Sequence, residues 1–263
     1  MPETIMDLEL QEKRALVTGA SRGIGFGIAR QLAVSGCKVM LCSRGGSALE
    51  HAVEALRESG GCVESIALDL SRRGNSAKAV EATIRQFGGI DILVNNVGGN
   101  HRKAFESTTD SDWDDLLELN FRGPLEAARA AIPDMKQRRE GAIIFIASIY
   151  GREFGGKDMS LYHVSKGAVI NLSKSLAAEL AEHGIRVNTV APGSIVFEGG
   201  SWDKRLKTDP EGMAEFICQH LPMGRFGSVQ EIGDAVAFLA SKRASLVTGT
   251  CWNVDGGQSR SMI

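Results

Sequence analysis

A short apolar strand, a glycine-rich turn and an amphipathic helix follow one another near the start of the chain. Residues 14–19 are mostly apolar, and Gly19, Gly23 and Gly25 separate them from the apolar-periodic residues 26–35. Glycines let the backbone approach a ligand closely, and the N-terminus of a helix presents free N–H groups to a pyrophosphate. The Gly-x3-Gly-x-Gly spacing is related to the G-x-G-x-x-G dinucleotide fingerprint but does not match it. An ordinary turn would fit the glycines alone, but the flanking strand and helix favour dinucleotide binding.

Strand and helix patterns alternate along the rest of the chain. The expected strands cover residues 38–43, 62–68, 91–95, 142–147, 185–191 and 250–254, and the expected helices cover 48–59, 75–87, 113–135, 161–181 and 228–241. This alternation predicts an α/β fold, in which a doubly wound (Rossmann) parallel sheet carries helices on both faces. No linker or break in composition interrupts it, so residues 1–263 are expected to form a single dinucleotide-binding and catalytic domain.

Composition argues against several other classes of protein. The formal net charge is −2, so no basic surface for nucleic acid or an anionic membrane is expected. The five cysteines show no CxxC spacing, which favours reduced thiols in a cytoplasmic protein. No apolar run is long enough for a membrane span, and the acidic residues 1–11 do not read as a signal peptide. No cluster of metal-ligating side chains is visible either, so no metal is expected.

The end of the second strand indicates which nicotinamide cofactor the chain would prefer. A carboxylate about 20 residues after the glycines would bind the ribose 2′-hydroxyl of NAD. Ser43 and Arg44 stand there instead. Together with Arg22 in the glycine turn, Arg44 could hold a 2′-phosphate through charge-assisted hydrogen bonds. Both arginines could also be merely solvated, but the pattern favours NADP(H) over NAD(H).

Polar residues follow three successive expected strands. Asp69 comes after the third strand, residues 95–98 (Asn-Asn-Val-Gly) after the fourth and Ser148 after the fifth. Such residues are often only caps or turns. Ligands bind at the carboxyl ends of the strands in open parallel sheets, however, so three of them in succession fit a cofactor crevice.

Tyr162 and Lys166 are four residues apart in the expected helix 161–181, one turn from each other on the same face. A phenol with a pKa of about 10 is a poor acid or base at neutral pH, and a neighbouring ammonium group would lower that pKa. The pair would then suit general acid–base catalysis. By itself the spacing is common in ordinary surface helices.

In combination, these motifs resemble the short-chain dehydrogenase/reductase family over about residues 13–258. The resemblance is carried by residues 18–25, Asp69, 95–98, Asn120, Ser148, Tyr162 with Lys166, 186–188, 191–193 and 254–257. Within the family, the chain is most similar to 3-oxoacyl-carrier-protein reductases and related NADPH-dependent ketone reductases. The implied reaction is hydride transfer between nicotinamide and a ketone or secondary alcohol, including 3-oxoacyl thioesters.

The resemblance implies four catalytic residues. Tyr162 would be the general acid for ketone reduction and the base in the reverse direction, and Ser148 would hydrogen-bond the substrate oxygen. Lys166 would hold the nicotinamide ribose and lower the pKa of Tyr162. Asn120 would kink its helix and anchor a water for proton relay.

The resemblance also implies a set of residues around the cofactor. The glycines would cradle the pyrophosphate, an acidic strand end would meet the adenine, and the Pro-Gly segment would meet the nicotinamide. The set comprises Gly19, Ser21, Arg22, Gly23, Ile24, Gly25, Ser43, Arg44, Asp69, Leu70, Asn95, Gly98, Tyr162, Lys166, Pro192, Gly193 and Ile195.

The chain departs from the family pattern at two places near the expected site. Phe197 stands where many relatives have a Thr that bonds the nicotinamide carboxamide. That contact is lost or moved, for example to Ser194, while the backbone of Ile195 could still serve. The loop 149–161 is one residue longer than in carrier-protein reductases, and is either a specificity element or simple loop variation. Residues 194–227 correspond to the substrate lid of relatives.

Three further expectations concern partners. The resemblance implies a homo-tetramer. Of the two basic positions that carrier-protein reductases use, Arg139 matches one, but His183 stands at the other. A small or medium ketone or acyl substrate is therefore favoured. A catalytically silent dinucleotide-binding sensor is the alternative function, although such a protein would normally have lost one of the four catalytic residues.

Overall fold

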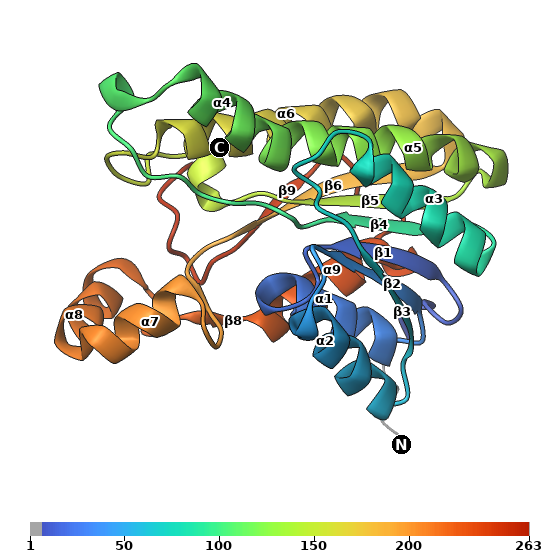
Figure 1. Cartoon of the computed structure of the whole chain (residues 1–263), viewed down its shortest axis with the longest axis horizontal. Helices are drawn as coiled ribbons and strands as arrows, with labels where there is room; N and C mark the ends of the chain where they lie inside the picture. The colour runs from blue at the N-terminus through green and yellow to red at the C-terminus, as the bar shows by residue number, and fades with distance from the viewer. Residues whose placement is uncertain (1–6, 263) are drawn as a thin grey trace.

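A seven-stranded sheet runs through the centre of the molecule (Figure 1). The computed structural model describes residues 7–262. The strands lie in the order β3 (Cys62–Ala67), β2 (Lys38–Ser43), β1 (Arg14–Thr18), β4 (Ile92–Asn95), β5 (Gly141–Ile146), β6 (Ile185–Pro192) and β9 (Cys251–Val254). Every neighbouring pair is parallel, which confirms the predicted doubly wound fold.

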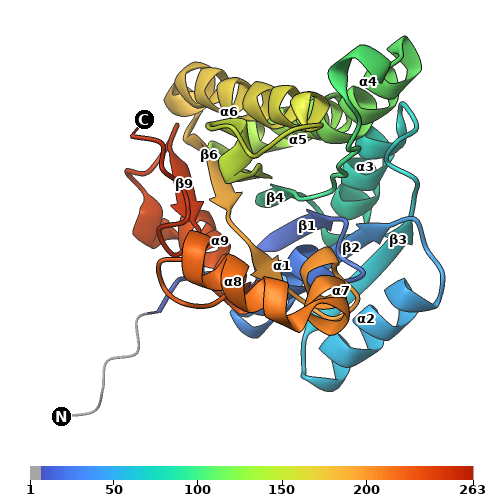
Figure 2. The same cartoon turned by 90° about the vertical axis from the view of Figure 1, so that its left-hand side faces the viewer.

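Helices cover both faces of this sheet (Figures 1 and 2). One layer holds α1 (Gly23–Val34), α2 (Ser47–Glu58) and α9 (Val229–Ala240), and the other holds α3 (Asn75–Phe87), α5 (Gly123–Arg138) and α6 (Ser160–Leu180). The hydrophobic core therefore has two parts, one on each face of the sheet. In β1, Ala15 and Val17 pack with the first layer, whereas Leu16 packs with the second. This is why the central strands are apolar at every position and not at alternate ones.

The long helical region expected over residues 113–135 is interrupted. It consists of α4 (Asp110–Leu117), a π-helical turn of five residues (Glu118–Arg122) and α5. Asn120 lies in that turn, as the family resemblance implied. The periodic pattern continues through the interruption, so it could not reveal the break.

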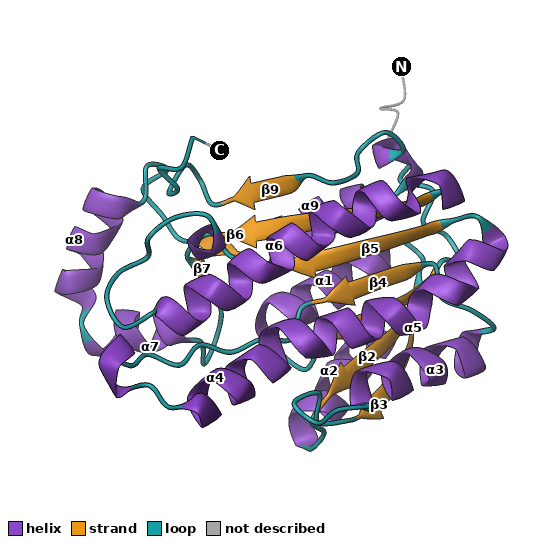
Figure 3. Ribbon diagram, turned by 90° about the horizontal axis from the view of Figure 1, so that it is seen from above, coloured by secondary structure: helices purple, strands orange, loops and turns teal. Residues whose placement is uncertain are grey.

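Residues 194–227 form two helices, α7 (Ser201–Thr208) and α8 (Pro210–His220), between two short strands. The strands β7 (Ile195–Val196) and β8 (Gly227–Ser228) pair in parallel. No strand was expected here, because two-residue strands are too short to show an alternating pattern. Seen from above, α7 and α8 lie beyond the arrowheads of the sheet (Figure 3).

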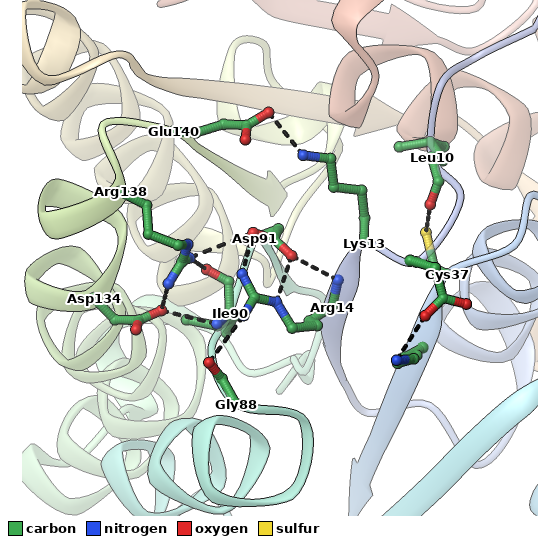
Figure 4. A network of polar contacts seen from close by, with 12 residues as sticks. Leu10, Lys13, Arg14, Cys37, Gly88, Ile90, Asp91, Asp134, Arg138 and Glu140 are labelled. Atoms are coloured by element: carbon green, nitrogen blue, oxygen red, sulfur yellow. Dashed lines mark hydrogen bonds and ion pairs between the residues drawn. The ribbon is translucent and has the colours of Figure 1, made fainter.

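A buried ion-pair network lies at the N-terminal ends of the strands, where β1 and β4 begin, opposite the ends that α7 and α8 adjoin (Figure 4). Arg14 donates two hydrogen bonds of 2.7 Å to Asp91, and Nη2 of Arg138 lies 3.4 Å from the same carboxylate. Burial would raise the pKa of Asp91, but the hydrogen bonds from Arg14 outweigh it and hold that pKa below its usual value. Arg138 also pairs with Asp134 of α5. The network thus joins the two strands to a covering helix.

Residues 1–6, part of the segment in which no signal peptide was expected, lie outside the described residues. Within residues 7–262, none of the helices combines the length and apolar character needed to cross a bilayer.

Candidate active site

The glycine turn after β1 is shaped to receive a ligand at the start of α1. Gly19 and Gly23 have positive φ angles of 66° and 61°. A Cβ atom on Gly25 would lie 2.3 Å from the carbonyl oxygen of Gly19, so no larger residue fits there. The helix begins with no capping side chain and no acidic residue in its first turn. Its free N–H groups and positive dipole end therefore suit the pyrophosphate of a dinucleotide.

Asn96 holds this turn in place, a role that the sequence reasoning missed. Its Nδ2 donates to the carbonyl oxygens of Thr18 (2.8 Å) and Gly19 (3.2 Å), and its backbone N–H donates to the Thr18 hydroxyl (2.9 Å). The repeated Asn in residues 95–98 was the available signal. Asn95 itself is buried, and its side-chain polar atoms have no hydrogen-bond partner in the described part of the chain. Since these atoms are inaccessible, only its backbone can meet a nucleotide.

The expected adenosine side lies at the ends of β2 and β3. Arg22 and Arg44 are exposed, and neither guanidinium group forms a hydrogen bond or ion pair with another residue in 7–262. Ser43, which precedes Arg44, and Leu70, which follows Asp69, are both buried. The side chain of Asp69 accepts a hydrogen bond of 2.7 Å from the Ser71 hydroxyl, and the Ser71 bonds lower its pKa. Two unpaired guanidinium groups at this place leave room for a phosphate ligand.

Lys166 is buried in α6, with only 5% of its surface exposed. Its Nζ donates to the carbonyl oxygen of Ile146 at the end of β5 (2.9 Å) and lies 5.8 Å from the centroid of the Tyr162 ring. A Cβ on Gly98 would come within 3.1 Å of this nitrogen, so the glycine leaves space for it. Burial lowers the pKa of Lys166 to about 8.

Tyr162 of α6 and Ser148 at the end of β5 are joined by a hydrogen bond between their side chains. Burial raises the pKa of Tyr162, and its hydrogen bond with Ser148 only partly opposes this. The prediction that Lys166 lowers the pKa of Tyr162 is therefore wrong for the chain without a bound cofactor. The ammonium group is directed to the Ile146 carbonyl, and desolvation of the phenol dominates.

Asn120 connects the π-helical turn to α6 and to the loop after β4. Its Oδ1 accepts from the backbone N–H of Gly99 (2.8 Å), and its Nδ2 donates to the Gly99 carbonyl (2.9 Å) and the Ser165 hydroxyl (2.9 Å). Ser165 in turn donates to the backbone carbonyl of Tyr162 (2.9 Å). Asn120 is thus linked through one hydroxyl to the turn of α6 that carries the tyrosine.

The Pro-Gly segment at the end of β6 lies beside the C-terminal residues. Gly193 donates to the carbonyl of Val254 (3.1 Å), and a Cβ on it would collide with Asp255. Pro192 ends β6 next to β9, and Ile195 is buried in β7. From these residues the segment 194–227 leaves the sheet.

Phe197 lies against the glycine turn. A Cβ on Gly23 would be 2.8 Å from its ring, and one on Gly200 would be 3.0 Å away. The aromatic ring of Phe197 thus makes an apolar contact with the start of α1.

The helices α7 and α8 share a small apolar core. Met213, Leu221 and Phe226 are buried in it, and the Trp202 ring lies 4.8 Å from that of Phe216 and 5.1 Å from that of Phe226. Such a unit can exclude water from a crevice while moving as one piece.

Comparisons with known proteins agree on one family. A family model described as Enoyl-(Acyl carrier protein) reductase matches residues 19–259. The chain is 36% identical to gluconate 5-dehydrogenase of Gluconobacter oxydans, covering 96% of this chain and 97% of that protein. It is 38% identical to the 3-oxoacyl-acyl-carrier-protein reductase FabG of Staphylococcus epidermidis, covering 93% and 98%.

Solved structures give the same result. L-sorbose reductase from Gluconobacter frateurii, in complex with NADPH and L-sorbose, superposes with a TM-score of 0.91 at 34% identity and covers 98% of this chain and 100% of its own. A 3-oxoacyl (acyl-carrier-protein) reductase from Agrobacterium tumefaciens with NADP bound has a TM-score of 0.89 at 31% identity, with 95% and 96% covered. With this fold, this crevice and these relatives, the chain belongs to the short-chain dehydrogenase/reductase family of oxidoreductases.

Proposed function

We propose that this chain reduces a ketone, or oxidises the corresponding secondary alcohol, with NADP(H) as the hydride carrier. The observation that supports this most directly is the convergence of Ser148, Tyr162, Lys166 and Asn120 at one end of the sheet. The reduced nicotinamide supplies a hydride when it is bound. The protein must then place the carbonyl and deliver a proton to its oxygen.

Tyr162 is the proposed proton donor. Because burial raises its pKa, its phenol is protonated at neutral pH and can donate to an oxygen on which negative charge develops. Ser148, hydrogen-bonded to Tyr162, would orient the same oxygen. Lys166, with a pKa of about 8, can hold or release a proton near neutral pH, and would bind the ribose. Asn120 would hold the relay from the backbone side.

The preference for NADP(H) rests on Arg22 and Arg44. Both guanidinium groups are exposed and lack an ion-pair partner within residues 7–262. A 2′-phosphate would supply that partner, and the ribose of NAD would not. Two related structures are described as containing NADP and NADPH, respectively.

The proposed substrate is a small or medium ketone. The names of the relatives include a sugar acid, a sugar and a carrier-bound acyl group. Arg139 precedes β5 and His183 precedes β6, so both lie at the N-terminal ends of the strands, whereas Ser148 lies at the C-terminal end of β5. Arg139 donates to the carbonyl of Glu182, whose carboxylate lies 3.6 Å from His183. These contacts favour a structural role for both side chains over carrier recognition by the same chain's site.

We further propose a single catalytic domain with residues 194–227 as its lid, acting as a cytoplasmic homo-tetramer. The continuous sheet and the separate apolar core of α7 and α8 support the domain and the lid. The tetramer rests on family resemblance, and light scattering of the purified protein would test it. No observation favours a catalytically silent sensor.

The deciding experiment follows NADPH oxidation against a panel of sugar ketones, simple ketones and 3-oxoacyl thioesters. Turnover of at least one ketone is expected. Tight NADPH binding without oxidation of any member of the panel would contradict the proposal.

A further inference from the structure

One carboxylate beside the active site holds the end of the chain. Oε2 of Glu153 accepts hydrogen bonds from the Ser259 hydroxyl (3.1 Å) and from the backbone N–H groups of Arg260 (2.8 Å) and Ser261 (3.0 Å). Glu153 belongs to the loop 149–161, which begins directly after Ser148. Figure 1 shows the C-terminus beside the yellow-green segment that follows β5.

Glu153 lies next to a tightly packed group of rings. The Tyr150 ring is 6.2 Å from that of His163, and a Cβ on Gly155 would be 2.5 Å from Cγ of Tyr150. Gly155 donates its backbone N–H to Nε2 of His163 (3.0 Å). The position of the Tyr150 ring therefore depends on where residues 152–155 run. Two neighbouring side chains hold this segment: Arg152 donates to Oδ1 of Asn253 in β9 (2.9 Å), and Glu153 binds the tail that follows β9.

Tyr150 in turn borders the reacting groups. Its backbone N–H donates to the Ser148 hydroxyl (3.2 Å). After burial, which has the larger effect, the nearby Tyr150 phenol also contributes to the raised pKa of Tyr162. A displacement of the loop would thus change the wall of the crevice next to both Ser148 and Tyr162.

The other end of the tail is fastened to the base of the lid. Oε1 of Gln258 accepts from the backbone N–H of Ser194 (2.7 Å), and Oδ2 of Asp255 accepts from that of Ser259 (2.8 Å). A Cβ on Gly256 would lie 3.2 Å from the sulfur of Met223, just after α8. The tail therefore touches the loop at one end and both ends of the lid segment at the other.

We propose that Glu153 is a positioning residue for substrate specificity, which fixes the loop 149–161, and with it Tyr150, by binding the backbone of the C-terminal tail. Specificity here refers to the ketone that the proposed reductase function takes as substrate. Glu153 itself need not touch that substrate.

The test combines variants at both ends of the contact. Glu153→Ala removes the acceptor, and Arg260→Pro removes one backbone N–H that it binds. Each is expected to raise KM for the ketone about tenfold, which corresponds to a loss of about 1.4 kcal/mol in substrate binding when the loop that carries Tyr150 is no longer held in place. NADPH affinity should stay unchanged. Arg260→Ala keeps the N–H and should match the wild type, and Glu153→Gln keeps an acceptor oxygen and should recover most of the loss.

The double variant Glu153→Ala/Arg260→Pro should be no worse than the poorer single variant, because both changes break the same contact. Additive losses, or an unchanged KM in both single variants, would overturn the proposal. Should Glu153→Ala fail to fold, the comparison of Arg260→Pro with Arg260→Ala decides the matter by itself.

A second readout does not depend on turnover. Hydrogen exchange of the loop 149–161 is expected to quicken in Glu153→Ala and Arg260→Pro, and not in Lys157→Ala, which changes an exposed residue of the same loop. Unchanged exchange would overturn the positioning role even in an active enzyme. Absence of ketone reduction in the wild type, with quickened exchange in the variants, would contradict the reductase function and leave the loop anchor standing.

Discussion

Burial shifts the pKa values of Lys166 and Tyr162 in opposite directions. It lowers the pKa of Lys166 to about 8 and raises that of Tyr162, because a charged form is disfavoured in each case. The lysine is brought closer to neutral pH, and the phenol is kept protonated. For reduction, a protonated donor is what the developing alkoxide requires.

Tyr162→Phe should therefore remove the proton donor while leaving the fold intact. We expect kcat for ketone reduction to fall by roughly 100-fold or more, the usual contribution of a general acid. NADPH affinity, measured by fluorescence titration, should change little. A variant with nearly full activity would end the assignment of the phenol as the donor.

Arg44→Ala should weaken NADPH binding about tenfold or more and leave NADH binding nearly unchanged, since only NADPH carries the 2′-phosphate. The dissociation constants of both cofactors provide the measurement. Arg30→Ala is a matched control, because it removes an exposed arginine from α1 beyond the glycine turn. Equal losses for both cofactors would contradict the phosphate site.

Lys166→Met should make the protein more stable at pH 7. A base whose pKa falls from about 10.5 to about 8 on folding costs stability wherever it is charged in the unfolded chain. The gain should be about 1–3 kcal/mol at pH 7 and should shrink as pH rises from about 8 to 10.5.

Urea unfolding at several pH values would measure this gain. Lys174→Met is the control, because Lys174 lies on the same helix but is exposed. A loss of stability in Lys166→Met at pH 7 would show that the hydrogen bond to Ile146 outweighs the cost of burial.

Among the elements, β1, β4 and α5 are tied together by the Arg14–Asp91–Arg138 network. The network lies where the strands begin (Figure 4), whereas Ser148 follows the end of β5. It joins segments far apart in the sequence at the place where no ligand is expected. Its contribution should therefore show in stability and not in turnover.

Asp91→Asn should lower the free energy of unfolding by about 2 kcal/mol at pH 7, because it leaves two partly buried arginines without their shared carboxylate. The folded pKa of Asp91 lies below its unfolded value of about 3.9, so the difference should persist above about pH 4 and vanish as pH falls through the folded pKa.

Thermal and urea unfolding of both proteins, with kcat as a second measurement, check this expectation. Glu140→Gln removes a more exposed ion pair with Lys13 in the same region and should cost no more than about 0.5 kcal/mol. A clear fall in kcat for Asp91→Asn would show that the N-terminal ends of the strands are coupled to the candidate active site at their C-terminal ends.

Considering the whole molecule, the parallel sheet and the helices on both of its faces were predictable from the alternation of apolar runs, because each βα unit buries its own apolar face. The glycine turn was also predictable, because its requirements are local: Gly19 and Gly23 adopt positive φ angles, and Gly25 has no room for a side chain. The residues of the crevice could be named from the family resemblance, and the structure brings Ser148, Tyr162, Lys166 and Asn120 together. Their assigned roles remain predictions.

Features that depend on contacts distant in sequence were not predictable. The raised pKa of Tyr162 depends on how deeply the fold buries the phenol, which no spacing reveals. Asn96 contacts Thr18 across 78 positions, and Glu153 contacts the tail across more than a hundred. The interruption at residues 118–122 and the two-residue strands of the lid leave no periodic signature.

The placement of the Asp91 network has a practical meaning for redesign. The Asp91 ion pairs lie where the strands start and the proposed chemistry where they finish, so the length of the strands separates the two. Substitutions at the N-terminal ends of the strands could therefore raise stability without changing the candidate active site. Conversely, the residues at the C-terminal ends could be redesigned for a new alcohol while the Asp91 network keeps the sheet folded.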